Sequence, residues 1–183
     1  MCVIVDTNTF SPVFNVKDQK HPEFKPVMDW ILHGKGILVV GGTKYMAELK
    51  KSSHYLRLIL MIKKFTNKVL HVDDKEVDAQ QKTIEKSIQN RDFDDPHLPA
   101  LVIVSRCQLI CSCDDRSVKF VTNSTLYPKG IITPRYYMGI RNKDLLCDKY
   151  IDSRYKPLTK TSKKEAKSLE EQLNSIINGS SKF

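Results

Sequence analysis

Short, largely apolar runs are separated along this chain by longer segments in which apolar residues recur every three or four positions. The runs predict strands, because strands of a parallel sheet are covered on both faces and are apolar throughout. The clearest run is Cys-Val-Ile-Val, which ends at Asp6. We predict strands at 2–5, 37–40, 69–72 and 109–112, and a fifth, edge strand at 130–133.

The segments between these runs have helical spacing and the residues that commonly begin helices. Asp95 precedes Pro96, a pair typical of a helix cap and first helical position, and the apolar residues that follow predict a buried helix. We predict helices from Pro22 to Gly34, from about Lys44 to Lys64, from Asp73 or Asp74 through Ile88, and from Asp95 onward. Strands alternating with helices indicate an α/β fold with three α/β/α layers and a central, mainly parallel sheet.

Residues 156–183 differ from the rest of the chain, because they are rich in Lys and Ser and hold few large apolar residues. Ser162 and Glu165 form a capping box, and the apolar residues that follow predict an amphipathic helix over 163–177. We therefore divide the chain into a domain at 1–155 and a linker with a C-terminal helix. The apolar stripe of this helix must be buried on the body of the protein, on a second copy or on a partner.

The chain is basic, with a formal net charge of +9 over 183 residues. Such an excess of Lys and Arg indicates a polyanionic partner such as nucleic acid, or else only a solubilising surface. Hydrophobic residues make up 40% and charged residues 28% of the chain, so wholesale disorder is excluded.

The five cysteines are odd in number, and Cys111 and Cys113 stand too close for a standard zinc pair. They predict reduced thiols and a cytoplasmic protein. We expect no signal peptide, since the first apolar run stops at Asp6, and no membrane segment, since no apolar run approaches the length of a span.

Four acids occupy positions that a parallel sheet would bring together. Asp6 and Asp114 follow apolar runs, and Glu48 and Asp95 lie near the starts of predicted helices. The carboxyl ends of strands and the amino ends of the following helices meet at one edge of such a sheet. The carboxylates would repel one another there, and Mg²⁺ or Mn²⁺ would relieve that repulsion, because both ions prefer oxygen ligands.

Four motifs resemble the PIN-domain family of metal-dependent nucleases. Val-Ile-Val-Asp-Thr-Asn at 3–8 is similar to its opening strand, and Tyr-Met-Ala-Glu-Leu at 45–49 to its second acidic element. Asp-Pro-His-Leu-Pro-Ala-Leu at 95–101 is similar to its Asp-x-His-x-x-Ala-Leu-Ala helix. Leu-Ile-Cys-Ser-Cys-Asp-Asp at 109–115 resembles the strand that leads to the fourth acid. The resemblance covers roughly residues 2–140.

The fourth acid stays open between Asp114 and Asp115, because Ser112 and Cys113 stand where the family often has Thr-Asn or Thr-Asp. Asp114 keeps the family's spacing of nineteen residues from Asp95, so we favour Asp114.

The resemblance implies a Mg²⁺- or Mn²⁺-dependent endoribonuclease that acts on single-stranded or loop RNA. Asp6, Glu48 and Asp95 would hold the ion, and Asp114 would close the site or hold a second ion. Asn8 and Ser112 would orient these acids, and His97 either touches a phosphate or a metal-bound water or is a solvated or structural residue of the helix surface. Basic residues expected to contact nucleic acid are Lys44, Lys50, Lys51, Arg116 and Arg141.

Other functions remain open at this stage. A PIN-like domain that has lost turnover would act as an RNA-binding or scaffolding subunit, and a nuclease of DNA flaps is a third hypothesis. The resemblance also fits a toxin or host-defence nuclease, whose partner would be an inhibitor or antitoxin protein. The C-terminal helix could mediate self-association into a homo-oligomer.

Overall fold

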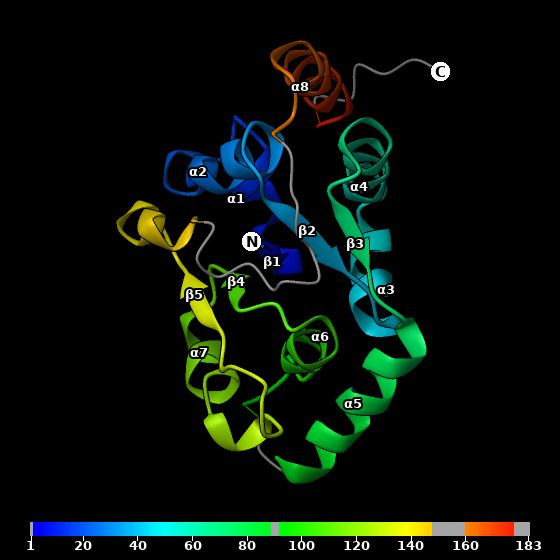
Figure 1. Cartoon of the computed structure of the whole chain (residues 1–183), viewed down its shortest axis with the longest axis vertical. Helices are drawn as coiled ribbons and strands as arrows, with labels where there is room; N and C mark the ends of the chain where they lie inside the picture. The colour runs from blue at the N-terminus through cyan, green and yellow to red at the C-terminus, as the bar shows by residue number, and fades with distance from the viewer. Residues whose placement is uncertain (1, 89–91, 148–159, 178–183) are drawn as a thin grey trace.

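The computed structural model describes residues 2–88, 92–147 and 160–177. It contains one sheet of five parallel strands in the order β3-β2-β1-β4-β5, which confirms the predicted α/β class (Figure 1). The strands are β1 Cys2–Val5, β2 Ile37–Val40, β3 Val69–His71, β4 Leu109–Cys111 and β5 Arg135–Tyr137.

The chain builds this sheet outward from β1 in two directions. It passes from β1 to β2 and β3, and then returns to the other side of β1 to add β4 and β5. Because parallel crossovers are right-handed, the reversal places helices on opposite faces of the sheet. Figure 1 shows α1, α2, α4 and α8 on one face and α5, α6 and α7 on the other. The reversal also leaves a crevice where β1 and β4 end, the usual ligand position in such sheets.

The helical segments fill the crossovers between strands and cover the sheet. They are η1 Thr7–Thr9, α1 Phe10–Phe14, α2 His21–Leu32, α3 Thr43–Lys51, α4 Ser53–Thr66, α5 Asp74–Ser87, α6 His97–Ser105, α7 Asp115–Val121, η2 Ser124–Leu126, η3 Ile140–Leu145 and α8 Lys163–Ile177. None of the helices that the structure describes combines the length and the apolar character that a membrane span requires.

The core forms where the apolar strands meet the apolar helix faces. All residues of β1, β2 and β4 are buried, as the continuous apolar runs predict for central parallel strands. Helix α6 is apolar around most of its circumference and packs against β1 and β2. The five cysteines remain thiols, in agreement with the sequence.

The long helix predicted from Lys44 to Lys64 is wrong, because the chain forms two helices that meet at Ser52. Ser52 has a non-helical conformation (φ −116°, ψ 86°), and its N–H is bonded to Leu49 in a tightened last turn. Adjacent serines favour such a break, because their hydroxyls compete for backbone hydrogen bonds. Helix α3 is thereby free to point toward β1 independently of α4.

The edge strand predicted at 130–133 is also wrong, since the fifth strand is β5, a few residues later. Gly130 has a positive φ of 90° and lies in a turn closed by a hydrogen bond from Ile131 to Pro128. The ladder starts only after Pro134, with the N–H of Arg135 donating to Gln108. Ile131 and Ile132 therefore lie outside the strand, and Tyr136 and Tyr137 are the buried residues of β5.

The C-terminal helix α8 packs on the body of the protein, against α2 and α4. The capping box is present: Ser162 Oγ accepts from the N–H of Glu165, and Glu165 Oε2 accepts from the N–H of Ser162. Leu169 and Leu173 are buried. Of the predicted linker, residues 156–159 lie outside the described residues, as does the domain boundary at 155.

We predict that Leu169→Ala lowers the free energy of unfolding by about 2–5 kcal/mol, the usual cost of truncating a fully buried leucine. Urea unfolding followed by circular dichroism measures this change. Lys167→Ala, on the exposed side of the same helix, is the matched control and should change the free energy by less than about 0.5 kcal/mol. Equal stability of the two variants would mean that α8 does not stay docked in solution.

Candidate functional site

Asp6 lies at the end of β1, beside the end of β4 where the chain reverses direction across the sheet. Its side chain is buried, and its Oδ2 accepts a hydrogen bond of 2.7 Å from Ser112 Oγ. The same hydroxyl oxygen accepts from the N–H of Asp114 at 3.0 Å. Ser112 therefore orients Asp6 and shapes the turn that follows β4, the supporting role expected from the sequence.

Glu48 is directed to the same edge by two contacts of η1 and β1 with helix α3. Tyr45, one turn earlier in α3, is buried and donates its hydroxyl to the carbonyl of Val5 at 2.6 Å. Thr7 Oγ1 then donates to Glu48 Oε2 at 2.7 Å. Because Val5 and Thr7 flank Asp6 in the chain, these two bonds bring Glu48 to the end of β1.

Asp95 lies just before α6 and His97 is its first residue, and both side chains lie near the other acids. Helix α6 begins at His97, so Pro96 takes the capping position, and the expectation that Asp95 caps the helix is wrong. The carboxylate of Asp95 instead faces the ring of His97, with Oδ1 3.9 Å from Nδ1. The other ring nitrogen, Nε2, lies 3.9 Å from Glu48 Oε2. His97 thus stands between two of the predicted acids.

His97 is fully buried, with 0% of its side chain exposed, so the alternative of a solvated helix-surface residue is wrong. Helix α6 packs against α5, β1 and β2, and the ring of His97 lies beside the buried ring of Tyr45, with 6.1 Å between their centroids. Neither ring nitrogen has a hydrogen-bond partner among the described residues. Burial lowers the pKa of His97 to about 3, and the nearby charge of Lys44 acts in the same direction.

The acids are close enough to affect one another's charge. Burial raises the pKa of Asp95 to about 7, and Asp6 is the largest of the neighbouring charges that contribute, followed by Asp94 and then Glu48. Burial also raises the pKa of Asp6, although the hydrogen bond from Ser112 opposes this. The arrangement concentrates negative charge in a partly buried place, which is costly without a cation.

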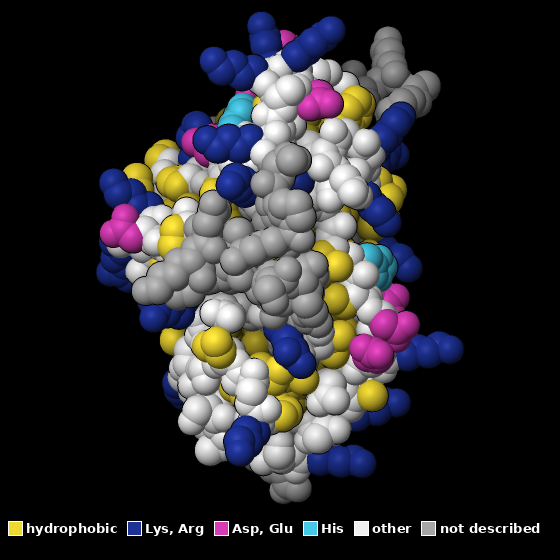
Figure 2. All heavy atoms as spheres, viewed as in Figure 1, with side chains coloured by type: hydrophobic (Ala, Val, Ile, Leu, Met, Phe, Trp, Pro, Cys, Tyr) yellow, Lys and Arg dark blue, Asp and Glu magenta, His cyan; other side chains and the backbone are white. Residues whose placement is uncertain are grey.

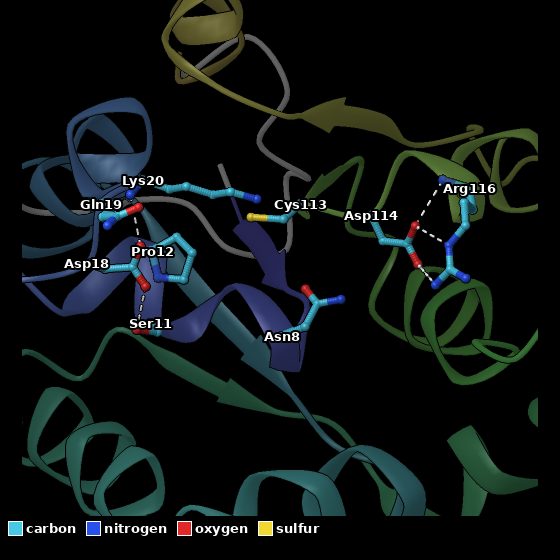
Figure 3. A pocket seen from close by; sticks show the side chains of 9 residues that line it. All are labelled: Asn8, Ser11, Pro12, Asp18, Gln19, Lys20, Cys113, Asp114 and Arg116. Atoms are coloured by element: carbon cyan, nitrogen blue, oxygen red, sulfur yellow. Dashed lines mark hydrogen bonds and ion pairs between the residues drawn. The ribbon is translucent and has the colours of Figure 1, made fainter.

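Asp114 lies farther out and is paired. Its Oδ1 accepts from the backbone N–H of Arg116 at 2.9 Å, and its Oδ2 accepts from Arg116 Nη2 at 2.9 Å. Figure 3 shows the carboxylate turned toward this arginine, whose hydrogen bonds lower the pKa of Asp114. Asp114 still raises the pKa of Asp6, whereas Asp115 is exposed in the first turn of α7. Of the two residues, Asp114 is the one that acts on the buried acids.

Two open pockets lie beside this group and share Asn8, whose side chain is exposed. The larger pocket has a volume of about 640 Å³. Figure 3 shows its lining, which is Asn8, Ser11, Pro12, Asp18, Gln19, Lys20, Cys113, Asp114 and Arg116. The smaller pocket has a volume of about 280 Å³ and is lined by Thr7, Asn8, Glu48, Leu49, Lys51, Ser52 and Tyr55. Together they form a surface depression on both sides of Asn8.

The five predicted basic residues are placed unequally. Lys44 donates to the carbonyl of Asp94 and lowers the pKa of Asp95, so it lies at the site. Lys51 lines the smaller pocket, and Arg116 lines the larger one while paired with Asp114. Lys50 lies near Asp74 instead. Arg141 is exposed in η3, and no described contact joins it to the acids.

On the face shown in Figure 2, Lys and Arg side chains are spread around the molecule and do not gather in a single patch. The basic residues placed beside the acids or the two pockets are Lys20, Lys44, Lys51 and Arg116.

Sequence reasoning missed three residues that complete this site. Thr7 and Tyr45 hold Glu48 in place, and both could have been noticed because each stands next to or one turn from a predicted acid. Tyr136 was not detectable, because β5 was predicted in the wrong place. Burial raises the pKa of Tyr136, and the charges of Asp6, Asp95 and Asp114 raise it further. Its hydroxyl is hydrogen-bonded to Ser117.

The donors fit a hard divalent cation. Carboxylate oxygens suit Mg²⁺ and Mn²⁺, which retain several waters and need only one or two protein ligands at contact distance. Within the described ranges, the one group of three whose ligand atoms all lie within 4.8 Å of one another is elsewhere, at Asp29, His33 and Glu170. Among the described residues, no three of the predicted acids and His97 meet this spacing, so these side chains offer at most two closely spaced ligand atoms to one ion.

Comparisons with protein-family models, with curated proteins and with solved structures found no match for this chain. The resemblance to PIN domains consequently rests on its four motifs alone.

We predict that Asp95 makes the metal-free protein less stable as pH rises from about 4 to about 7, while His97 acts in the opposite direction. The folded protein keeps a proton on Asp95 up to about pH 7, whereas the unfolded chain releases it near pH 4, so the contribution of Asp95 is lost through that window. His97 is neutral in the folded protein above about pH 3 but protonated in the unfolded chain up to about pH 6.5, so its contribution grows as pH rises. Asp95→Asn removes only the first contribution, so its stability relative to the unaltered protein should increase with pH. Urea unfolding in EDTA at about pH 5 and pH 8 measures the difference.

The control for this experiment is Asp144→Asn, which removes an exposed acid of η3. Its stability relative to the unaltered protein should be the same at both pH values. A stability difference between Asp95→Asn and the unaltered protein that does not change with pH would contradict the assignment of this titration to Asp95.

Proposed function

We propose that this protein is a metal-dependent endoribonuclease that hydrolyses phosphodiester bonds in single-stranded or loop RNA, with a site made of Asp6, Glu48, Asp95 and Asp114. One observation carries the proposal. Asp6 after β1, Glu48 in α3 and Asp95 before α6 converge at the switch point of a parallel sheet: Asp6 and Glu48 raise the pKa of Asp95, and Glu48 and Asp114 raise the pKa of Asp6. Such a concentration of carboxylates is a common way to hold a catalytic divalent ion.

Mg²⁺ or Mn²⁺, when bound, would supply charge for the scissile phosphate and lower the pKa of a coordinated water. Asp6, Glu48 and Asp95 would hold the ion. Ser112 and Thr7 keep Asp6 and Glu48 in fixed orientations through their hydrogen bonds.

The surroundings of the acids support a flexible polyanionic substrate. The two pockets are open to solvent and present Lys20, Lys51 and Arg116 for contacts to phosphates. Tyr55 lines the smaller pocket and offers a ring on which a base could stack. The net charge of +9 favours approach of RNA to the whole molecule. We infer a cytoplasmic enzyme of the toxin or host-defence type, whose inhibitor or antitoxin partner would cover this edge.

We predict that Asp6→Asn abolishes cleavage of labelled RNA in Mn²⁺ or Mg²⁺ while leaving the far-ultraviolet circular dichroism unchanged, because it removes one charge but preserves the size of the side chain. Rates should fall by at least about a hundredfold, the scale of losing one electrostatic contribution in a closed site. EDTA should abolish cleavage by the unaltered protein as well.

Asp144→Asn is the matched control, because it makes the same chemical change on the exposed surface of η3. It should cleave at the original rate. Cleavage by Asp6→Asn at the original rate would refute the site, and cleavage in EDTA would refute the metal dependence.

A second candidate function is a catalytically silent RNA-binding or scaffolding module. The pairing of Asp114 with Arg116 favours it, because that pairing already neutralises the fourth acid. Arg116→Ala should therefore increase metal affinity if the site is catalytic, and should only weaken RNA binding if it is not.

We predict that RNA affinity of the Asp6→Asn variant decreases steeply with salt, because each phosphate neutralised by a basic side chain releases condensed counterions. The slope of log affinity against log salt should be about −0.7 for each phosphate contact on a single strand. Fluorescence anisotropy with a labelled oligoribonucleotide measures it. Lys51→Ala should make the slope shallower by about that amount, whereas Lys35→Ala, in the turn before β2, should not. A flat response would remove nucleic acid as the partner.

A further inference from the structure

His97 is the least satisfied buried group beside the four acids. Its side chain is fully buried, and neither ring nitrogen has a hydrogen-bond partner among the described residues. A buried polar atom without a partner is costly, so a native structure rarely keeps one unless a ligand or water satisfies it. Each ring nitrogen lies near a carboxylate: Nδ1 is 3.9 Å from Asp95 Oδ1, and Nε2 is 3.9 Å from Glu48 Oε2.

The order Asp95, His97, Glu48 matches a common arrangement around metal ions. A histidine that binds a metal through one ring nitrogen usually donates the N–H of its other nitrogen to a carboxylate, which fixes the ring. Here Asp95 is the carboxylate beside Nδ1, and the 3.9 Å between Oδ1 and Nδ1 would have to shorten by about 1 Å for it to accept the Nδ1–H. No hydrogen bond to another described side chain holds the Asp95 carboxylate away from the ring. Glu48 already accepts a hydrogen bond from Thr7, so it has less need of one from His97.

The spacing of Nε2 and Glu48 Oε2 also suits a shared ion. A separation of 3.9 Å is too long for a hydrogen bond. Two ligand atoms on one ion, each at about 2.1 Å from it, stand roughly 3–4 Å apart. An ion between them would satisfy the lone pair of Nε2 and the charge of Glu48 together.

We propose that His97 Nε2 is a nitrogen ligand of the metal site, oriented by Asp95, so that the site selects Mn²⁺ over Mg²⁺. The inference rests on the proposed function only in needing a divalent ion at the acids. Nitrogen ligands discriminate between the two ions, because imidazole binds first-row transition metals whereas Mg²⁺ prefers oxygen. Asp95 then contributes by holding the ring through one oxygen as well as by its charge.

The direct test is pulsed electron paramagnetic resonance of the full chain loaded with one equivalent of Mn²⁺. Electron spin echo envelope modulation detects a directly bound ¹⁴N. The unaltered protein should show this modulation, and His97→Gln should not. Absence of ¹⁴N modulation in protein that has bound Mn²⁺ through Asp6 would overturn the inference and leave the proposed function intact.

Calorimetric titrations with Mn²⁺ alone and Mg²⁺ alone give the selectivity. His97→Gln keeps a polar group at the position of Nε2 but presents oxygen, so the ratio of Mn²⁺ to Mg²⁺ affinity should fall at least tenfold while Mg²⁺ binding persists. The matched control is His21→Gln, because His21 is also buried and its Nε2 also lacks a partner among the described residues. His21 begins α2 and is hydrogen-bonded through Nδ1 to the carbonyl of Pro12. Its replacement should leave the ratio unchanged.

Thermal melting in EDTA verifies that each variant folds. If His97→Gln does not fold, His97→Asn replaces it in both experiments. An unchanged ratio in a folded His97 variant would overturn the nitrogen ligand. The proposed function and this inference fail together if the unaltered protein binds neither ion. They also fail together if Asp6→Asn binds both ions as tightly as the unaltered protein.

Discussion

The main physical constraint on this protein is the electrostatic repulsion between carboxylates at the end of β1, which the rest of the fold must offset. Asp6 is buried there, and burial and its neighbours raise its pKa and that of Asp95. A group of acids in such a place destabilises the folded state unless something else compensates. The apolar strands beneath it and the hydrogen bonds around it provide that compensation, and a cation would add to it.

The polar residues around the acids act on orientation rather than on charge. Ser112 donates to Asp6, and Thr7 donates to Glu48, so each carboxylate has one defined direction. Tyr45 ties the helix that carries Glu48 to β1. These bonds link β1, α3 and β4 and keep like charges near one another. The hydrogen bonds therefore hold together a group of charges whose proximity is itself destabilising.

A different interaction secures the opposite side of the molecule. Lys68 is buried beneath the start of α8, where Nζ donates to the carbonyl of Gly34 and to Thr161 Oγ1, each at 2.5 Å. It binds the end of α2 to the residues that precede α8, while Leu169 and Leu173 fill the apolar contact. The helix is thus held to the sheet domain by a buried cation and by apolar burial, far from the acids.

The sequence by itself determined the elements whose patterns are local. The apolar run before Asp6, the cap at Asp73 and the capping box at Ser162 each predict a strand or helix that the structure confirms, because periodicity and capping depend on residues within one or two turns. The sequence also placed Asp6 after one apolar strand and Ser112 at the end of another. In the structure these strands, β1 and β4, are neighbours in the sheet.

Only the tertiary structure decided what depends on distant segments. The break at Ser52 separates two helices whose apolar pattern continues across it, and the fifth strand forms after Pro134 because β4 offers it a partner there. The burial of His97 follows from the packing of α6 against α5, β1 and β2. The position of Glu48 follows from the hydrogen bond that Tyr45 of the same helix donates to Val5 in β1. Each outcome depends on which surfaces meet in three dimensions, and no window of sequence contains both of them.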